Sequence, residues 1–231
     1  MTVLLVVIAV VAVLWAVARF HLAGEDLRRF DTPPAVSDPP PAEPSAEHFE
    51  AVELIRQMQA RSEGRMSRSE RLRRMREAAD AMADGVDFGV AFTPADAAGV
   101  PGEWVRASGA DPDRRLLYIH GGAFTLGSPK SHRAITSKLS KIAGASVLAI
   151  DYRLMPEHRR LDCLADCQKA YRWVVDHGPE GAAPARALFV AGDSAGGNLT
   201  LALVAWVRDA GLRPPDGAVA LSPLTLSLIH I

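Results

Sequence analysis

The chain opens with an unbroken run of apolar residues, MTVLLVVIAVVAVLWAVA, which carries no charge from Met1 to Ala18. A run of about 18 apolar residues can span a bilayer as a single helix. A cleaved signal peptide is the alternative, because Ala16-Val17-Ala18 resembles a cleavage site, but no positive charge precedes the run. The pattern therefore favours an uncleaved, single-pass transmembrane anchor over residues 1–20.

Positive charges appear only after this run, at Arg19, Arg28 and Arg29. Basic residues tend to stay on the cytoplasmic side of a membrane. This bias predicts that the anchor attaches the chain to the membrane and that the rest of the protein lies in the cytoplasm.

The next segments are a proline-rich stretch and two helical stretches. TPPAVSDPPPAEP, residues 32–44, cannot form a helix, so residues 21–45 are expected to be an extended linker. Helical patterns follow over 46–60 and 67–82. The second is rich in arginine, but acidic residues are interleaved with the arginines, which is typical of a solvated face with intrahelical ion pairs rather than of a lipid-binding face.

From about Val86 the pattern changes to short β-rich runs that alternate with helical ones. Strands followed by helices are typical of a mostly parallel sheet with helices on both faces, so the fold class is α/β. The predicted strands are 86–92, 103–108, 114–120, 146–152, 187–193 and 217–223, and the predicted helices are 131–143, 162–176 and 195–210.

Composition narrows the picture. The 231 residues suffice for one mid-sized domain plus an appendage, and a formal net charge of -1 gives no reason to expect a nucleic-acid partner. Cys163 and Cys167 lie four positions apart in one predicted helix, with no cluster of cysteine and histidine nearby. They are expected to be free, packed thiols, and neither a metal nor a cofactor is expected.

The segment AGDSAGGN, 191–198, contains G-x-S-x-G between a predicted strand and a predicted helix. A sharp strand-to-helix turn strains the serine backbone and needs small neighbours, and it holds the serine Oγ above the sheet edge. Ser194 is therefore a candidate nucleophile, with a plain glycine turn as the alternative.

HGGAF, 120–124, follows another strand. An acyl-transfer enzyme stabilises its oxyanion best with backbone N–H groups that are fixed before the reaction, and glycines let the main chain approach closely. Gly121 and Gly122 are therefore candidate oxyanion donors, together with the N–H of Ala195.

These motifs resemble those of the hormone-sensitive-lipase-like family of α/β-hydrolases, the bacterial carboxylesterases with an HGGG loop. HGGAF resembles the family's oxyanion loop, DYRLMPEH (151–158) its D-Y-R-L-A-P-E-H segment, and GDSAGGN its nucleophile elbow. The resemblance runs from about Ala46 to Leu224. It implies an α/β-hydrolase fold, with residues 46–84 as an N-terminal helical cap and 85–225 as a partial hydrolase domain whose last strands are missing.

The resemblance also implies roles for single residues. Ser194 would be the nucleophile, and Gly121, Gly122 and Ala195 would form the oxyanion hole. His120 and Asp193 would support the loop. Arg153 and Glu157 would form a structural polar network below the site. The sequence departs from the family pattern at Ala123, which replaces a glycine, and at 159–161, where Arg-Arg-Leu replaces Pro-Phe-Pro.

A serine nucleophile needs a histidine base and a carboxylate, which follow it in this fold. After Ser194 the only acidic residues are Asp209 and Asp216, and the only histidine is His230. None is expected at the required strand end, so this chain alone is expected to be inactive or nearly so. Its last six residues, LSLIHI (226–231), match the translation of CTGTCTCTTATACACATC, a transposon end used in DNA library preparation, and are expected to be a non-native tail.

The sequence thus predicts a serine carboxylesterase or lipase-like enzyme that acts on a small-molecule ester through an acyl-enzyme at Ser194. The alternative is a catalytically dead relative that binds a small apolar ligand. A binding protein has no physical need for a serine Oγ held in an elbow, so the enzyme is favoured. Acyl and alcohol specificity and oligomeric state do not follow from the sequence.

Overall fold

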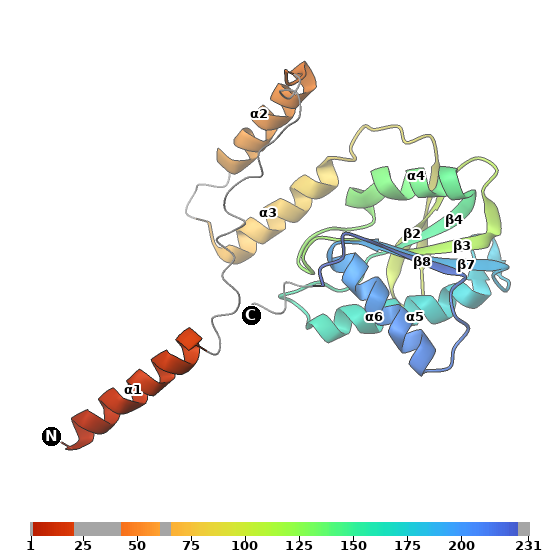
Figure 1. Cartoon of the computed structure of the whole chain (residues 1–231). Helices are drawn as coiled ribbons and strands as arrows, with labels where there is room; N and C mark the ends of the chain where they lie inside the picture. The colour runs from red at the N-terminus through yellow and green to blue at the C-terminus, as the bar shows by residue number, and fades with distance from the viewer. Residues whose placement is uncertain (1, 21–42, 61–65, 226–231) are drawn as a thin grey trace. The chain divides into compact units, whose positions relative to one another are not determined.

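The structure, a computed structural model, describes residues 2–20, 43–60 and 66–225. The chain divides into two units, Met1–Arg61 and Ser62–Ile231. The first unit contains α1 (Thr2–Phe20) and α2 (Ala46–Ala60) (Figure 1).

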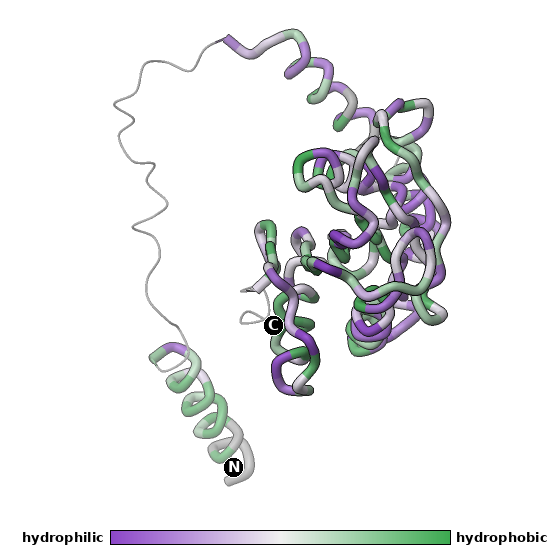
Figure 2. Tube along the Cα trace, turned by 90° about the vertical axis from the view of Figure 1, so that its right-hand side faces the viewer, coloured by the Kyte–Doolittle hydropathy of each residue, from purple (hydrophilic) through white to green (hydrophobic). Residues whose placement is uncertain are grey.

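Helix α1 is hydrophobic along most of its length (Figure 2). Even so, within the ranges that the structure describes, no helix is both long enough and apolar enough to cross a membrane. Arg19 lies in the last turn of α1, so the uncharged part, residues 2–18, rises only about 26 Å against about 30 Å of hydrocarbon. The predicted single-pass anchor over 1–20 is therefore wrong. The predictions of membrane attachment and of a cytoplasmic orientation depended on this anchor, so they are wrong as well.

The second unit holds a six-stranded sheet, its helices and a two-stranded pair. The sheet strands are β1 (Ala91–Asp96), β2 (Pro101–Arg106), β3 (Asp111–Ile119), β4 (Ala145–Ile150), β7 (Ala187–Asp193) and β8 (Gly217–Leu221). The helices are α3 (Arg68–Ala81), the 3-10 turn η2 (Lys130–His132), α4 (Arg133–Ala143), α5 (Arg160–Asp176) and α6 (Ala195–Asp209). The short strands β5 (His177–Gly178) and β6 (Gly181–Ala182) pair with each other.

The sheet has the order β1-β2-β4-β3-β7-β8. Strands β4, β3, β7 and β8 run parallel, whereas β2 is antiparallel to both of its neighbours. The predicted mostly parallel sheet is therefore confirmed. Because parallel strands end at the same edge, the segments that follow β3 and β7 lie next to each other.

Helices cover both faces of this sheet, with α4 on one face and α5 and α6 on the other (Figure 1). Successive side chains of a strand point to opposite faces. Accordingly, Leu117 and Ile119 of β3 pack in the cluster that includes α5 and α6 residues, and Leu116 and Tyr118 pack in the cluster that includes Ile135 of α4. Cys163 and Cys167 are free and buried in the first cluster, as expected.

The first strand begins later than predicted, at Ala91 rather than Val86. The Asp87 carboxylate accepts the Gly89 N–H at 2.8 Å, and Gly89 has a φ of 60°. This local turn interrupts the extended pattern. Pro94 then lies within β1, where an edge strand tolerates its missing N–H.

The termini of two helices follow local capping. Ser67 precedes α3 and accepts the Glu70 N–H with its hydroxyl at 3.2 Å. Helix α5 starts at Arg160 rather than at the predicted Asp162, because the Asp162 carboxylate accepts the N–H of Arg159 at 2.9 Å and so lies inside the first turn.

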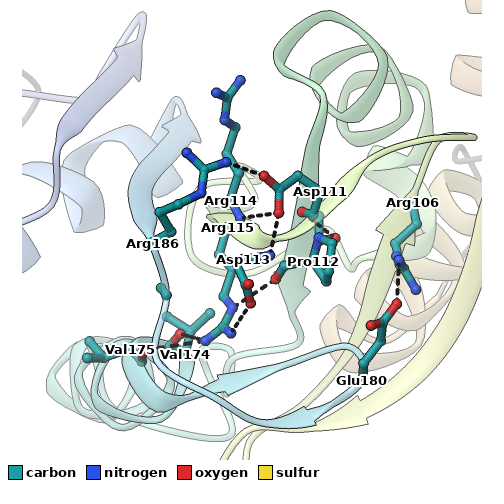
Figure 3. A network of polar contacts seen from close by, with 12 residues as sticks. Arg106, Asp111, Pro112, Asp113, Arg114, Arg115, Val174, Val175, Glu180 and Arg186 are labelled. Atoms are coloured by element: carbon teal, nitrogen blue, oxygen red, sulfur yellow. Dashed lines mark hydrogen bonds and ion pairs between the residues drawn. The ribbon is translucent and has the colours of Figure 1, made fainter.

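A buried arginine ties the amino end of β3 to the end of α5 (Figure 3). The Arg115 side chain has no exposed surface. Its Nη1 donates to the Val174 carbonyl at 3.0 Å and its Nε to the Pro112 carbonyl at 3.0 Å. Burial lowers the pKa of Arg115 below its usual value. A Cβ on Gly178 would lie 2.8 Å from the Arg115 Nη2, so the glycine leaves room for the guanidinium.

Candidate functional site

Ser194 joins the end of β7 to the start of α6 in a strained conformation. Its φ is 51° and its ψ is -115°, a region that residues other than glycine rarely occupy. The Ser194 N–H donates to the Leu221 carbonyl at 2.9 Å, and its carbonyl accepts the N–H groups of Asn198 at 3.1 Å and Leu224 at 2.9 Å. These bonds hold the serine at the carboxyl edge of the sheet, in the predicted elbow.

Glycine is required on both sides of the serine. A Cβ on Gly196 would lie 2.0 Å from the Ile119 carbonyl oxygen and 2.5 Å from that of His120. A Cβ on Gly192 would lie 2.6 Å from the same Ile119 oxygen. The elbow therefore packs directly against the end of β3, where the glycine-rich loop begins.

That loop is equally tight. Gly122 has a φ of 114°, and a Cβ there would lie 2.2 Å from the Leu126 carbonyl oxygen. Gly127 has a φ of 89°, and its Cβ would lie 2.5 Å from the Gly121 carbonyl oxygen. The glycines are thus needed for close packing of the main chain as well as for its conformation.

Asp193 connects the elbow to the loop. Its Oδ1 accepts the Gly121 N–H at 2.9 Å and the Tyr118 hydroxyl at 2.7 Å, and the His132 Nε2 lies 3.6 Å away. Burial by itself would raise the pKa of the Asp193 carboxyl, but the polar groups around it, His132 foremost, lower that pKa below its usual value.

This contact corrects one expectation. Because the Gly121 N–H already donates to Asp193, it is not available to an oxyanion. Within residues 66–225, the N–H groups of Gly122, Ala123 and Ala195 have no hydrogen-bond acceptor, and Ala123 is exposed. Ala123 was not among the donors expected from the sequence, because the loop donors were chosen as glycines and this position is an alanine.

His120 lies behind the loop. Its Nδ1 lies 2.8 Å from the Gly121 carbonyl oxygen, and its ring stacks on Tyr152 with the ring centres 4.3 Å apart. The Tyr152 hydroxyl donates to the His120 carbonyl at 2.8 Å. Burial lowers the pKa of His120 to about 4, so the ring is neutral near pH 7. A neutral, enclosed ring fits a bracing role rather than proton transfer.

Arg153 and Glu157 do not share a network. Arg153 donates from Nε and Nη2 to the Asp166 carboxylate on α5, both at 2.7 Å. Glu157 instead accepts from Arg76 of α3. The expected single network is therefore wrong, because the two side chains are bound to different helices.

Helix α3 contacts the loop directly, which the sequence did not reveal. The Arg76 Nε donates to the Thr125 carbonyl at 2.8 Å and its Nη2 to the Met155 carbonyl at 2.9 Å. Asp80 accepts a hydrogen bond from the Ser128 hydroxyl. Five arginines lie on α3, and their periodicity alone does not single out Arg76.

The later acidic residues lie away from the serine. Asp216 accepts the N–H of Leu188, near the amino end of β7, at 2.7 Å. Six residues of strand, about 20 Å, separate Leu188 from Ser194. Asp209 pairs with Arg208 at the end of α6 and is exposed. His230 and the proposed tail 226–231 lie outside the described residues.

Residues 116–229 match a family model described as the alpha/beta hydrolase fold. An "Acetyl-hydrolase" from Streptomyces hygroscopicus is 45% identical over 121 residues, which are 52% of this chain and 39% of that protein. Human hormone-sensitive lipase is 34% identical over 124 residues, 53% of this chain and 12% of that protein. The chain thus spans less than half of the length of these curated relatives.

Solved structures agree with this family match. A crystal structure of an esterase from the bacterial hormone-sensitive lipase family superposes with a TM-score of 0.66 at 33% sequence identity. The superposition covers 79% of this chain and 59% of that chain. A crystal structure of an esterase/lipase from an uncultured bacterium gives a TM-score of 0.65 at 33% identity, covering 78% and 59%.

Proposed function

Because this chain belongs to the hormone-sensitive-lipase-like α/β-hydrolases, we propose that it is a serine carboxylic-ester hydrolase. The Ser194 Oγ attacks the ester carbonyl carbon, the bond from that carbon to the alcohol oxygen breaks, and the alcohol leaves with the serine proton. Water then cleaves the acyl-enzyme, which releases a carboxylic acid and restores the hydroxyl.

The observation that carries this proposal is the strained Ser194 backbone next to a loop with unbonded N–H groups. We assign the oxyanion to the N–H groups of Gly122, Ala123 and Ala195. Backbone donors that are held before the reaction stabilise developing negative charge without reorganisation. Gly121 is excluded because its N–H is bonded to Asp193.

Asp193 and His120 support this oxyanion loop. Asp193 accepts the Gly121 N–H, and the His120 ring packs against the loop next to the Gly121 carbonyl. Neither is assigned a proton-transfer role, and the reaction requires neither a metal nor a cofactor.

A serine hydroxyl is a weak nucleophile without a histidine base. The histidine rings that form hydrogen bonds in the described ranges, His120, His132 and His177, bond to groups other than Ser194. We therefore infer that the 231-residue chain by itself hydrolyses esters several orders of magnitude more slowly than a complete triad enzyme does.

The test compares the 231-residue chain with the product of the complete reading frame at the source locus. Both are assayed on p-nitrophenyl acetate, butyrate and palmitate, with Ser194→Ala and the exposed Ser108→Ala as a matched pair of variants. We expect turnover by the full product, loss of at least about a thousandfold in Ser194→Ala, and no change in Ser108→Ala. Turnover that survives in Ser194→Ala contradicts the proposal.

The alternative is a relative that binds a small apolar ligand without hydrolysing it. It predicts a folded full product that turns over none of the three esters. Such a protein would leave Ser194 unacylated after incubation with p-nitrophenyl acetate, as read by the mass of the intact chain.

A further inference from the structure

Arg160, the first residue of α5, contacts both segments of the candidate site. Its Nη2 donates to the Asn198 Oδ1 at 2.6 Å, and Asn198 lies in the first turn of α6, bonded to the Ser194 carbonyl. The guanidinium carbon lies 5.1 Å from the centre of the Phe124 ring, and Phe124 follows Ala123 in the loop. The positive charge therefore lies between the oxyanion loop and the elbow helix.

The acidic residues near Arg160 in the chain are each held by a different arginine. These pairs are Glu157 with Arg76, Asp162 with Arg159, and Asp166 with Arg153. In the ranges 43–60 and 66–225, Arg160 forms no ion pair with a carboxylate. Phe124 and the Asn198 amide attract the guanidinium, but neither neutralises its charge.

Part of the guanidinium also lacks a hydrogen-bond partner. The Arg160 Nε is buried and has no acceptor within the described residues. A buried donor without an acceptor costs free energy, because the hydrogen bond to water that it gave up is not replaced. A carboxylate supplies the missing negative charge and accepts hydrogen bonds from the N–H groups of an arginine.

We propose that Arg160 binds a free carboxylate carried by the substrate, so that the site favours half-esters of dicarboxylic acids over neutral esters. The inference rests on the proposed function for the ester that reacts at Ser194. The recognition of the free carboxylate depends only on Arg160, and a binding measurement tests it without turnover.

The experiment uses two probes of similar shape, monomethyl succinate, which is anionic, and methyl levulinate, which is neutral. Calorimetric titration of the 231-residue chain measures the affinity for each. We expect monomethyl succinate to bind about tenfold more tightly. Arg160→Gln should remove this preference, Arg160→Lys should retain part of it, and Arg159→Gln should leave it unchanged, because the neighbouring Arg159 side chain is 82% exposed and paired with Asp162.

Equal affinity of the wild-type chain for both probes, or no binding of either, overturns the proposal whether or not the variants fold. A preference that persists in a folded Arg160→Gln variant also overturns it. Turnover is read separately, on the product of the complete reading frame. If Arg160→Gln loses the binding preference but the full product shows no turnover, the carboxylate site is supported and the esterase proposal fails. If both esters are turned over equally and bind equally, the esterase proposal is supported and the carboxylate site fails.

Discussion

Arg76 of α3 and Glu157, in the loop after β4, form a two-point ion pair with both nitrogen–oxygen distances at 2.9 Å. The hydrogen bonds from Arg76 lower the pKa of Glu157 to about 2, so the pair stays ionised across the neutral range. The same guanidinium bonds to the carbonyls of Thr125 and Met155. One side chain thus joins α3 to the oxyanion loop and to the segment after β4.

Replacing Arg76 with alanine should loosen α3. We expect Arg76→Ala to lower the free energy of unfolding by about 1–2 kcal/mol, because two carbonyls lose their charged donor. Arg73→Ala is the control, since Arg73 is 62% exposed and pairs only within α3, and it should cost less than about 0.5 kcal/mol. Urea denaturation and amide hydrogen exchange of α3 measure both effects, and equal losses would contradict this role.

Gly196→Ala should disrupt the elbow. The added Cβ would meet the main-chain oxygens of Ile119, the last residue of the central strand β3, and of His120, the residue that follows it. We expect a loss of at least about 3 kcal/mol in the free energy of unfolding. Gly197→Ala, one residue later, would meet Pro223 at 3.1 Å and the Gly192 carbonyl oxygen at 3.2 Å. These contacts are much longer than those at Gly196, so it should cost less than half as much in the same urea denaturation experiment.

Arg115→Met should destabilise the opposite end of the sheet. The Val174 and Pro112 carbonyls would lose their donor inside the protein, and we expect a cost of about 3 kcal/mol. Arg186→Gln serves as the comparison, because Arg186 is 62% exposed where it pairs with Asp111. It should cost less than about 1 kcal/mol. If thermal and urea unfolding show similar losses for the two variants, the buried arginine does not have this role.

His120 should make the fold sensitive to acid. Its pKa is about 4 in the folded chain and about 6.5 in an unfolded one. The unfolded chain therefore binds the proton first as the pH falls, so stability decreases from about pH 6.5 down to about pH 4. The full change is on the order of 3 kcal/mol.

The measurement is urea unfolding between pH 7.5 and 4.5 for wild type and His120→Asn. The variant lacks the titrating ring, so its stability should fall less steeply over this range. The carboxylates titrate alike in both proteins and cancel in the difference. Parallel profiles would show that His120 is not the group responsible.

The sequence by itself determined the parallel sheet, the bounds of β7 and the placement of Ser194 in an elbow. These features depend on local patterns: apolar runs of strand length, helical periodicity, and glycines on both sides of a serine. The same local patterns predicted the wrong start for β1, because the turn at Asp87 and Gly89 interrupts the extended backbone. They also predicted a membrane span in α1, although its uncharged part is too short to cross the hydrocarbon.

Only the tertiary structure decided which polar groups bond to one another. The Gly121 N–H is occupied because Asp193, 72 positions later, lies at the end of the adjacent parallel strand. Likewise, Glu157 pairs with Arg76 and Arg160 bonds to Asn198 because the fold places residues that are distant in the sequence next to each other. Hydrogen bonds between distant residues depend on strand order and helix packing, and a one-dimensional pattern of residue types does not encode that geometry.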